Sequence, residues 1–198
     1  MTKKEAIWRE ILYQALEKSQ RVFIQKELAE KFGFSTSTVF NALKIPRQVG
    51  AIKVTGRNFT VLNPEKLLYL WGTFRNLKKD IIYQTFTPYP VQETEALLPP
   101  GIIFGAYSAF RQKFKEAPAD YDKVYFYAPP KLLGEIKKRF PPKKGYLNLI
   151  VLKMDEFMID YNLVTTAAQT FVDLWNLPEW FASDFLKALK EEIDAILA

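Results

Sequence analysis

The sequence contains no cysteine and no histidine. Without cysteine there is no disulfide framework, no thiolate nucleophile and no cysteine-based metal site. Without histidine the chain lacks the commonest general base and the commonest zinc ligand. A Gly-rich phosphate-binding loop of the P-loop type and a catalytic triad are also missing from the sequence. We therefore expect no cofactor and no metal ion, and we expect the protein not to be an enzyme.

Long apolar runs are also missing. No segment approaches the roughly 18 apolar residues that a membrane-spanning helix needs. The first 20 residues, MTKKEAIWREILYQALEKSQ, mix charges of both signs with apolar residues and lack the apolar centre of a signal peptide. Apolar residues nevertheless make up 48% of the 198 residues, which is enough for a real core. We expect a soluble, cytoplasmic protein with no membrane partner.

The net charge of +6 lies in the first third of the chain. Residues 1–63 contain 11 Lys and Arg against 5 Asp and Glu, whereas residues 64–198 contain 17 of each kind. This asymmetry suggests a basic module that binds a polyanion, joined to a neutral module that does not bind one. A lysine-rich, solvated surface would produce the same count, so charge alone leaves both interpretations open.

Apolar spacing in the first module predicts three helices. A stripe of apolar residues predicts a helix over residues 5–18, and a short β-leaning segment follows at residues 20–24. A second helix covers residues 25–32 and stops at Gly33. Ser35 then caps a third helix, in which Val39 and Leu43 share the face that we expect to be buried. We expect Pro46 to end this helix, because the residue before a proline is pushed out of the α region.

A β-hairpin follows the third helix. Residues 52–54 and 59–61 alternate apolar and polar side chains on either side of the turn formed by residues 55–58. The order of helix, short strand, helix, turn, helix and hairpin predicts an N-terminal winged helix-turn-helix domain over residues 1–63. The segments KELAEKFGFSTSTVFNALK and VGAIKVTGRNFTV resemble bacterial and archaeal winged-helix regulators, and this resemblance implies binding to double-stranded DNA. Some winged helices serve only as protein-interaction modules, which stays an alternative.

The third helix is then the reader helix. Small hydroxyl residues in its first turn let the helix N-terminus approach phosphates closely. Asn41 is the best candidate base reader, because its amide can pair with adenine, although it could equally be a surface amide. Phe40 could contact a thymine methyl group or pack against the wing or the next domain. The predicted DNA-binding residues are Ser35, Thr36, Ser37, Asn41, Lys44, Arg47, Lys53 and Arg57. Each of the four cations could also be simply solvated, and Arg57 at the wing tip could enter the minor groove or touch a phosphate.

The second module, residues 64–198, alternates predicted helices and strands. The pattern predicts an α+β protein in which a mixed α/β domain follows the winged helix. The expected strands are residues 80–86, 102–104, 123–127 and 146–152, and the expected helices are residues 64–77, 91–98, 105–110, 130–139 and 180–197, with an apolar segment at 167–174. The sequence shows no internal repeat.

One constellation in this module is similar to the minimal nucleotidyltransferase pattern. In that family a Gly-Ser turn after a strand holds nucleotide phosphates, and two carboxylates on the next strand bind Mg²⁺. Here Asp120 and Asp122 could share a strand face, with Asp155 or Asp160 as a third carboxylate. However, Ala106 and Tyr107 separate the glycine from the serine, and residues 118–122 also fit a turn before a strand. A nucleotidyltransferase carrying a winged helix is therefore the alternative function.

A second resemblance covers most of the chain. The winged helix, the segment FGAYSAFRQKF, the strand after ADYDKVYFY and the late segment TTAAQTFVDLWNLPEW look like the AbiEi-type antitoxin and regulator family. The matching motifs are Tyr107-Ser108-Ala109 and the stretch from Gln169 to Leu174, for which plain helix packing is the alternative. The resemblance implies a transcriptional regulator that represses its own operon, with a second domain that counters a toxin encoded by a neighbouring gene.

Two further expectations concern the second module. Its aromatic content suits protein contacts, and we expect that the protein can form a homodimer. Four aromatic residues could line a pocket for a small ligand, or they could form core: Phe104, Tyr107, Tyr125 and Tyr127.

Overall fold

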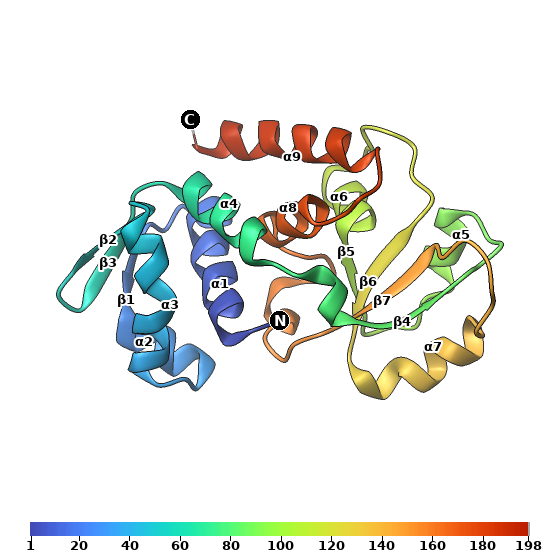
Figure 1. Ribbon diagram of the computed structural model, residues 1–198, viewed down its shortest axis with the longest axis horizontal. Helices are drawn as coiled ribbons and strands as arrows, with labels where there is room; N and C mark the ends of the chain where they lie inside the picture. The colour runs from blue at the N-terminus through green and yellow to red at the C-terminus, as the bar shows by residue number, and fades with distance from the viewer. Residues whose placement is uncertain (198) are drawn as a thin grey trace.

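The computed structural model describes residues 1–197, which form an α+β fold with two small β-sheets (Figure 1). The first sheet and three helices come from residues 1–63. Their order is α1 Lys3–Glu17, β1 Val22–Ile24, α2 Gln25–Phe32, α3 Thr36–Gln48, β2 Ile52–Thr55 and β3 Asn58–Val61. The predicted order of helices and hairpin in this part of the chain is confirmed.

The first sheet is antiparallel, with β3 in the centre between β1 and β2. The β2–β3 hairpin has the turn that the sequence predicts, and Gly56 in that turn has a φ of +62°, which is left-handed backbone that glycine adopts readily. The rings of Phe23 on β1 and Phe59 on β3 stack with centroids 5.1 Å apart, and both side chains are buried. This stacked pair packs the short β1 strand against the hairpin.

The C-terminal end of α2 and the beginning of α3 lie where the sequence predicts them. Gly33 ends α2 in a left-handed conformation, with a φ of +61°. Ser35 is the N-cap of α3, and its hydroxyl oxygen accepts a hydrogen bond from the backbone N–H of Thr38 at 3.2 Å. Val39 and Leu43 are buried, as expected from their spacing.

The expectation that Pro46 ends α3 is wrong. The helix continues to Gln48 with Pro46 inside it. A proline within a helix leaves the carbonyl of the residue four positions earlier, here Ala42, without its N–H donor. The indole N–H of Trp8 donates to that carbonyl oxygen at 2.8 Å, so the missing bond is replaced by a tertiary one.

The elements after residue 63 form the second sheet and the helices that cover it (Figure 1). They are α4 Pro64–Phe74, η1 Leu77–Asp80, β4 Ile81–Thr85, α5 Val91–Ala96, β5 Ile103–Gly105, α6 Ala106–Phe114, β6 Val124–Ala128, η2 Pro130–Leu132, α7 Leu133–Arg139, β7 Leu149–Lys153, η3 Met158–Tyr161, α8 Ala167–Trp175 and α9 Ala182–Leu197. The predicted strands and helices are present, although α4 ends three residues early, α6 extends to Phe114 and the strand expected from residue 146 begins only at Leu149.

The second sheet is mixed, with strand order β4-β7-β6-β5. The two inner strands, β6 and β7, are parallel, and the outer strands pair with them antiparallel. All five residues of β6 are buried, because helices lie on both faces of the sheet. Tyr125 and Tyr127 face the core shared with α1, α4, α6 and α8, whereas Phe126 faces a smaller core with Ile136 of α7.

The larger hydrophobic core runs across residue 63. It joins residues of α1 and α3, such as Ile7, Ile11 and Val39, to residues of α8 and α9, such as Phe171 and Leu189. Residues 167–174 of α8 are all buried, and Figure 1 shows α8 near the middle of the molecule with α9 above it. Within residues 1–197, no helix is long and apolar enough to cross a membrane.

Candidate nucleic-acid interface

The exposed face of α3 is the first part of the candidate interface. Val39, Ala42, Leu43 and Pro46 are buried, which turns the intervening residues outward. Thr36, Ser37, Asn41, Lys44 and Arg47 are all exposed. Ser37, Asn41 and Lys44 follow one another at intervals of four and three residues, so their side chains lie along one stripe of the helix surface.

The hydroxyl groups at the start of α3 bond to one another. The hydroxyl oxygen of Ser35 lies 2.8 Å from that of Ser37 and 2.9 Å from that of Thr38. Because these bonds hold the side chains against the first turn, the surface there stays small and polar. An exposed helix start of this kind allows a close approach by an anion such as a phosphate.

The hairpin supplies the second part. Lys53 on β2 and Arg57 in the turn are exposed. The backbone N–H of Gln25, at the start of α2, donates to the carbonyl oxygen of Arg57 at 3.2 Å. This bond ties the hairpin turn to the beginning of α2, so the Arg57 side chain projects from a fixed backbone.

Phe40 is 48% exposed, and the ammonium group of Lys44 lies 5.4 Å from the centre of its ring. Together with Val54 of β2 and Arg47, these two residues line a shallow hollow between α3 and the hairpin. The face of α3 and the hairpin therefore form one continuous surface.

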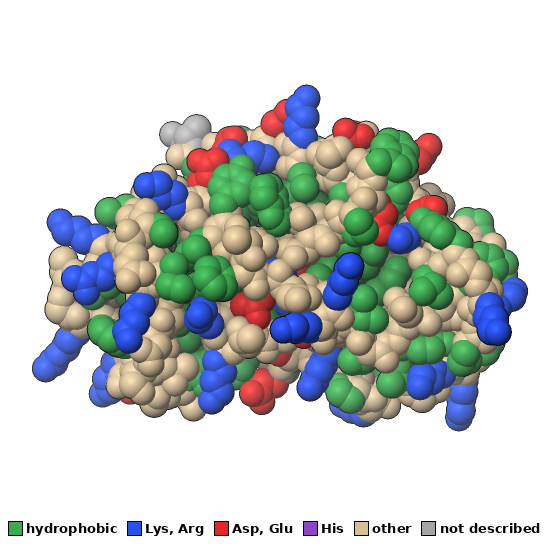
Figure 2. All heavy atoms as spheres, viewed as in Figure 1, with side chains coloured by type: hydrophobic (Ala, Val, Ile, Leu, Met, Phe, Trp, Pro, Cys, Tyr) green, Lys and Arg blue, Asp and Glu red, His purple; other side chains and the backbone are tan. Residues whose placement is uncertain are grey.

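The cations of this surface are not neutralised within the chain. Among residues 1–197, no Asp or Glu forms an ion pair with Lys44, Arg47, Lys53 or Arg57. Figure 2 shows Lys and Arg side chains spread over the end of the molecule that carries the hairpin and α3, where Asp and Glu are scarce. Positive charge without internal partners is the electrostatic requirement of a phosphate-binding surface.

The carboxylates of the first module lie elsewhere because α1 directs three of them toward the second module. Glu5 accepts from Arg75, Glu10 accepts from Tyr161 and Lys31, and Glu17 accepts from Lys113 and from the backbone N–H of Ala167. Three of the five carboxylates in residues 1–63 are therefore engaged away from α3 and the hairpin, which leaves the cations of that surface uncompensated by them.

The nucleotidyltransferase alternative required two carboxylates on a strand. β6 begins at Val124, so Asp120 and Asp122 lie before the strand and do not share one of its faces. This agrees with the alternative interpretation, in which residues 118–122 form a turn that leads into the strand. Asp122 accepts a hydrogen bond from the Tyr146 hydroxyl at 3.1 Å, and Asp155 is paired with Arg9. Ser108, which would face the nucleotide in that family, is fully buried. Among residues 1–197, no three Asp or Glu side chains are grouped so that they could hold a metal ion.

The aromatic residues considered as a ligand pocket are mostly core. Tyr107 and Tyr127 are fully buried, and Tyr125 is nearly so. The Tyr107 hydroxyl donates to Glu179 at 3.1 Å, and its ring packs against Phe181 and Phe185 with centroids 4.9 Å apart. The Tyr107 ring of α6 therefore belongs to the core beside the start of α9.

A buried polar network between α8 and its neighbours was missed by the sequence analysis. Asp173 of α8 accepts from Arg75 at 3.2 Å and from the Tyr127 hydroxyl at 2.7 Å, and it is fully buried. Burial raises the pKa of Asp173 to about 6, although Arg75 opposes that shift. Burial and the Asp173 carboxylate raise the pKa of Tyr127 well above its ordinary value, so the tyrosine stays a donor.

A second ion pair, between a buried arginine and a partly exposed aspartate, reaches α1. The Arg9 guanidinium donates to both carboxylate oxygens of Asp155, at 2.7 and 2.8 Å, and to Gln169 of α8 at 3.2 Å. Gln169 and Asp173 are two of the three polar residues of the antitoxin-like motif, with Thr170 the third. The signal that could have found them is a polar residue at each end of one buried helical turn, because buried polar groups require partners.

No protein-family model, curated protein or solved structure matches this chain. Its function must therefore be inferred from its own residues. The structure places all eight candidate residues on the surface of α3, its N-cap and the hairpin, and none of them in the core.

Proposed function

We propose that the protein is a DNA-binding transcriptional regulator and that residues 1–63 act as a winged helix-turn-helix domain. The order of elements supports this: three helices, a short strand between the first two, and a hairpin that joins that strand in an antiparallel sheet. In this arrangement α3 enters the major groove and the β2–β3 hairpin is the wing.

The single observation that carries the proposal is the uncompensated positive surface formed by α3 and the hairpin. Lys44 and Arg47 on the helix and Lys53 and Arg57 on the hairpin are exposed and have no carboxylate partner in the described chain. Basic side chains that release counterions from DNA provide most of the nonspecific affinity. Asn41, between the hydroxyl-rich first turn and Lys44, is the residue suited to read a base edge.

The test is to titrate labelled duplex DNA with the full-length protein and to measure the fluorescence anisotropy of the DNA at several salt concentrations. For the double variant Lys44→Ala/Arg47→Ala, the slope of log K against log salt should fall by about 2, because about 0.9 ions are released per phosphate contact. The matched control is Lys138→Ala/Lys187→Ala, which removes two exposed lysines from α7 and α9 and should leave the slope unchanged.

Absence of affinity for any duplex at low salt would overturn the proposal. Equal losses in the two double variants would also count against it, because they would show that only the overall charge matters. A footprint on the DNA upstream of the protein's own gene would support autorepression.

We further propose that the second module provides protein contacts, either to a toxin from a neighbouring gene or to a second copy of this chain. The support is the sequence resemblance to AbiEi-type antitoxins, together with two exposed tryptophans: Trp175 is 47% exposed and Trp180 is 76% exposed. Exposed tryptophans are frequent anchors of protein interfaces. Sedimentation of the protein alone, and co-purification with the product of the adjacent gene, test the two partners separately.

A further inference from the structure

Trp180 is the most exposed of the large apolar side chains of residues 1–197, with 76% of its surface open to solvent. It lies in the segment that joins α8 to α9 (Figure 1). Its ring meets that of Phe181 edge to face, with centroids 5.5 Å apart, and most of the indole stays uncovered. Because burying an aromatic side chain is favourable, this indole is suited to insert into a partner surface.

The backbone that carries Trp180 is held on both sides. The carboxylate of Glu179 accepts hydrogen bonds from the hydroxyl groups of Tyr107 at 3.1 Å and Tyr125 at 3.2 Å. On the other side Phe181 is buried, and its ring packs on that of Tyr107. The indole is therefore presented from a fixed turn, which lowers the entropic cost of using it as an anchor.

A hollow of about 190 Å³, here named the β4 hollow, opens directly beside this turn. Its walls come from η1, β4, β6, β7 and residues 176–179, the last of which lead into Trp180. The aliphatic part of its lining consists of Leu77, Ile81, Leu147, Ile150, Leu177 and Pro178. An apolar cavity of about 150 Å³ is enough to hold a benzene molecule. The β4 hollow is therefore of a size to take one indole ring.

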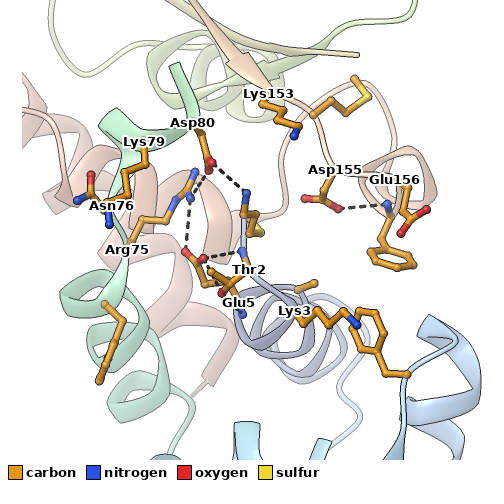
Figure 3. Close-up of a pocket in the computed structure, with 16 residues that line it drawn as sticks. Thr2, Lys3, Glu5, Arg75, Asn76, Lys79, Asp80, Lys153, Asp155 and Glu156 are labelled. Atoms are coloured by element: carbon orange, nitrogen blue, oxygen red, sulfur yellow. Dashed lines mark hydrogen bonds and ion pairs between the residues drawn. The ribbon is translucent and has the colours of Figure 1, made fainter. Parts of the chain in front are cut away.

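The wall that η1 contributes is fixed as well. Leu77 and Lys78 of the lining belong to η1, which ends at Asp80. Asp80 accepts from the Arg75 guanidinium at 2.6 Å, and Figure 3 shows this pair beside the first turn of α1, where Arg75 also reaches Glu5. Because these ion pairs hold η1 against α1, the β4 hollow is formed before any partner arrives.

Charges of opposite sign accompany the β4 hollow and the turn. Lys78 lines the hollow, and Asp184 lies in the first turn of α9, four residues after Trp180. Both side chains are exposed, and neither forms an ion pair within the part of the chain that the structure describes. A second copy of the chain would supply each of them with a partner of opposite sign.

Trp180 and the β4 hollow are neighbours on one chain, so the surface that contains both can be self-complementary. A two-fold rotation then brings the indole of each copy to the hollow of the other. We infer that two copies of this chain form a dimer in which each Trp180 inserts into the β4 hollow of the other copy, with Lys78 facing Asp184. This inference rests on the proposed role of the second module in protein contacts and names the second copy as the occupant; it does not depend on DNA binding.

The dimer should be weak. Each inserted tryptophan buries about 150–250 Å², so two of them make up only part of the roughly 1,200–2,000 Å² of a standard interface. A dissociation constant of about 10–200 μM is therefore expected. Sedimentation of the full-length protein without DNA, over a range that brackets these values, measures it.

Trp180→Ala should weaken dimerisation at least about tenfold, since tryptophan anchors carry much of the energy of an interface. Gln84→Trp should weaken it similarly, because Gln84 is an exposed residue of the lining and the larger side chain fills the β4 hollow. The matched control is Ile159→Ala/Leu163→Ala, which removes two apolar side chains that are 71% and 70% exposed and line no part of the hollow. It should dimerise like the parent, and all these variants should melt like the parent, because the substituted residues are exposed.

Cysteine cross-linking tests the arrangement itself. The chain has no cysteine, so any disulfide comes from the introduced residues. A mixture of the separate variants Lys78→Cys and Asp184→Cys should give a covalent heterodimer on mild oxidation, with the bond between positions 78 and 184 identified by mass spectrometry. Adding Trp180→Ala to both variants should abolish the cross-link.

The inference is overturned if the parent stays monomeric up to about 500 μM, well above the expected dissociation constant. It is also overturned if Trp180→Ala dimerises like the parent, or if the 78–184 cross-link forms equally well without Trp180. A monomeric protein that co-purifies with the product of the adjacent gene would leave the proposed role in protein contacts standing while this inference fails. A dimer that binds no duplex DNA would have the opposite meaning: the dimer stands and the proposed DNA-binding function fails.

Discussion

The indole N–H of Trp8 donates to the carbonyl oxygen of Ala42 at 2.8 Å, and both residues are buried. In an unbroken α-helix the backbone N–H of residue 46 would donate to this carbonyl, but Pro46 has no N–H to donate. A side chain of α1 thus completes the hydrogen bonding of α3, 34 residues further along the chain. The same contact fixes the distance between the two helices and holds the exposed face of α3 in place.

Trp8→Phe should destabilise the protein by about 2–3 kcal/mol, because it removes volume from the core and leaves a buried carbonyl without a donor. The cost should be about 1 kcal/mol smaller when Pro46 is also replaced by alanine, since the restored N–H can serve Ala42. Urea unfolding of the four proteins in this cycle gives the coupling energy. Equal costs in the two backgrounds would show that Trp8 acts through packing alone.

Asn41→Ala and Lys44→Ala should affect DNA binding in different ways. Loss of a base contact should cost about 1–3 kcal/mol at one base position and relax the sequence preference there. Loss of a phosphate contact should weaken binding to all sequences alike. Anisotropy titrations on the preferred site and on its single-base variants separate the two. An Asn41→Ala protein with unchanged sequence preference would contradict the assignment of Asn41 as a reader.

The pH dependence of stability should carry a contribution from Asp173. Its pKa is raised to about 6 in the folded protein, above the ordinary value, so the folded state holds this proton more firmly than the unfolded chain. The free energy of unfolding of the parent should therefore fall, relative to that of Asp173→Asn, as the pH rises from about 4 to about 7. Above about pH 7 the difference between the two should be constant.

Urea unfolding of both proteins at pH 4.5, 5.5, 6.5 and 7.5 measures this difference. The slope attributable to one group cannot exceed about 1.4 kcal/mol per pH unit. If the parent instead gains stability relative to Asp173→Asn as the pH rises, then Arg75 outweighs burial and lowers the pKa of Asp173. Asp80 is present in both proteins, so its own loss of stabilisation at low pH appears in both curves.

A fragment of residues 1–63 should not form a stable fold by itself. Ile7 and Ile11 of α1 lie in the core that continues to α8 and α9, so the fragment would expose this apolar surface to water. Exposing apolar surface costs about 25 cal/mol per Å². Circular dichroism should show that the fragment has much less helix than these residues have in the whole protein. A cooperative melt of the fragment would contradict this and would support an independent first domain.

Local patterns in the sequence determined most of the secondary structure. Gly33 determined where α2 ends and Ser35 determined where α3 begins. The alternation of apolar and polar side chains on either side of Gly56 determined the hairpin. Each of these effects depends only on neighbouring residues. The spacing of Val39 and Leu43 likewise determined which face of α3 is exposed, and hence where Asn41 and Lys44 lie.

Contacts between distant parts of the chain decided the rest. Pro46 stays inside α3 because Trp8 supplies the missing donor, and no window of sequence around Pro46 contains that information. The carboxylates of α1 bond to partners in the second module, such as Arg75 and the backbone N–H of Ala167, and this leaves the α3 surface with its uncompensated charge. Only the tertiary structure decides such positions, because ion pairs and clefts form between residues that are close in space and remote in sequence.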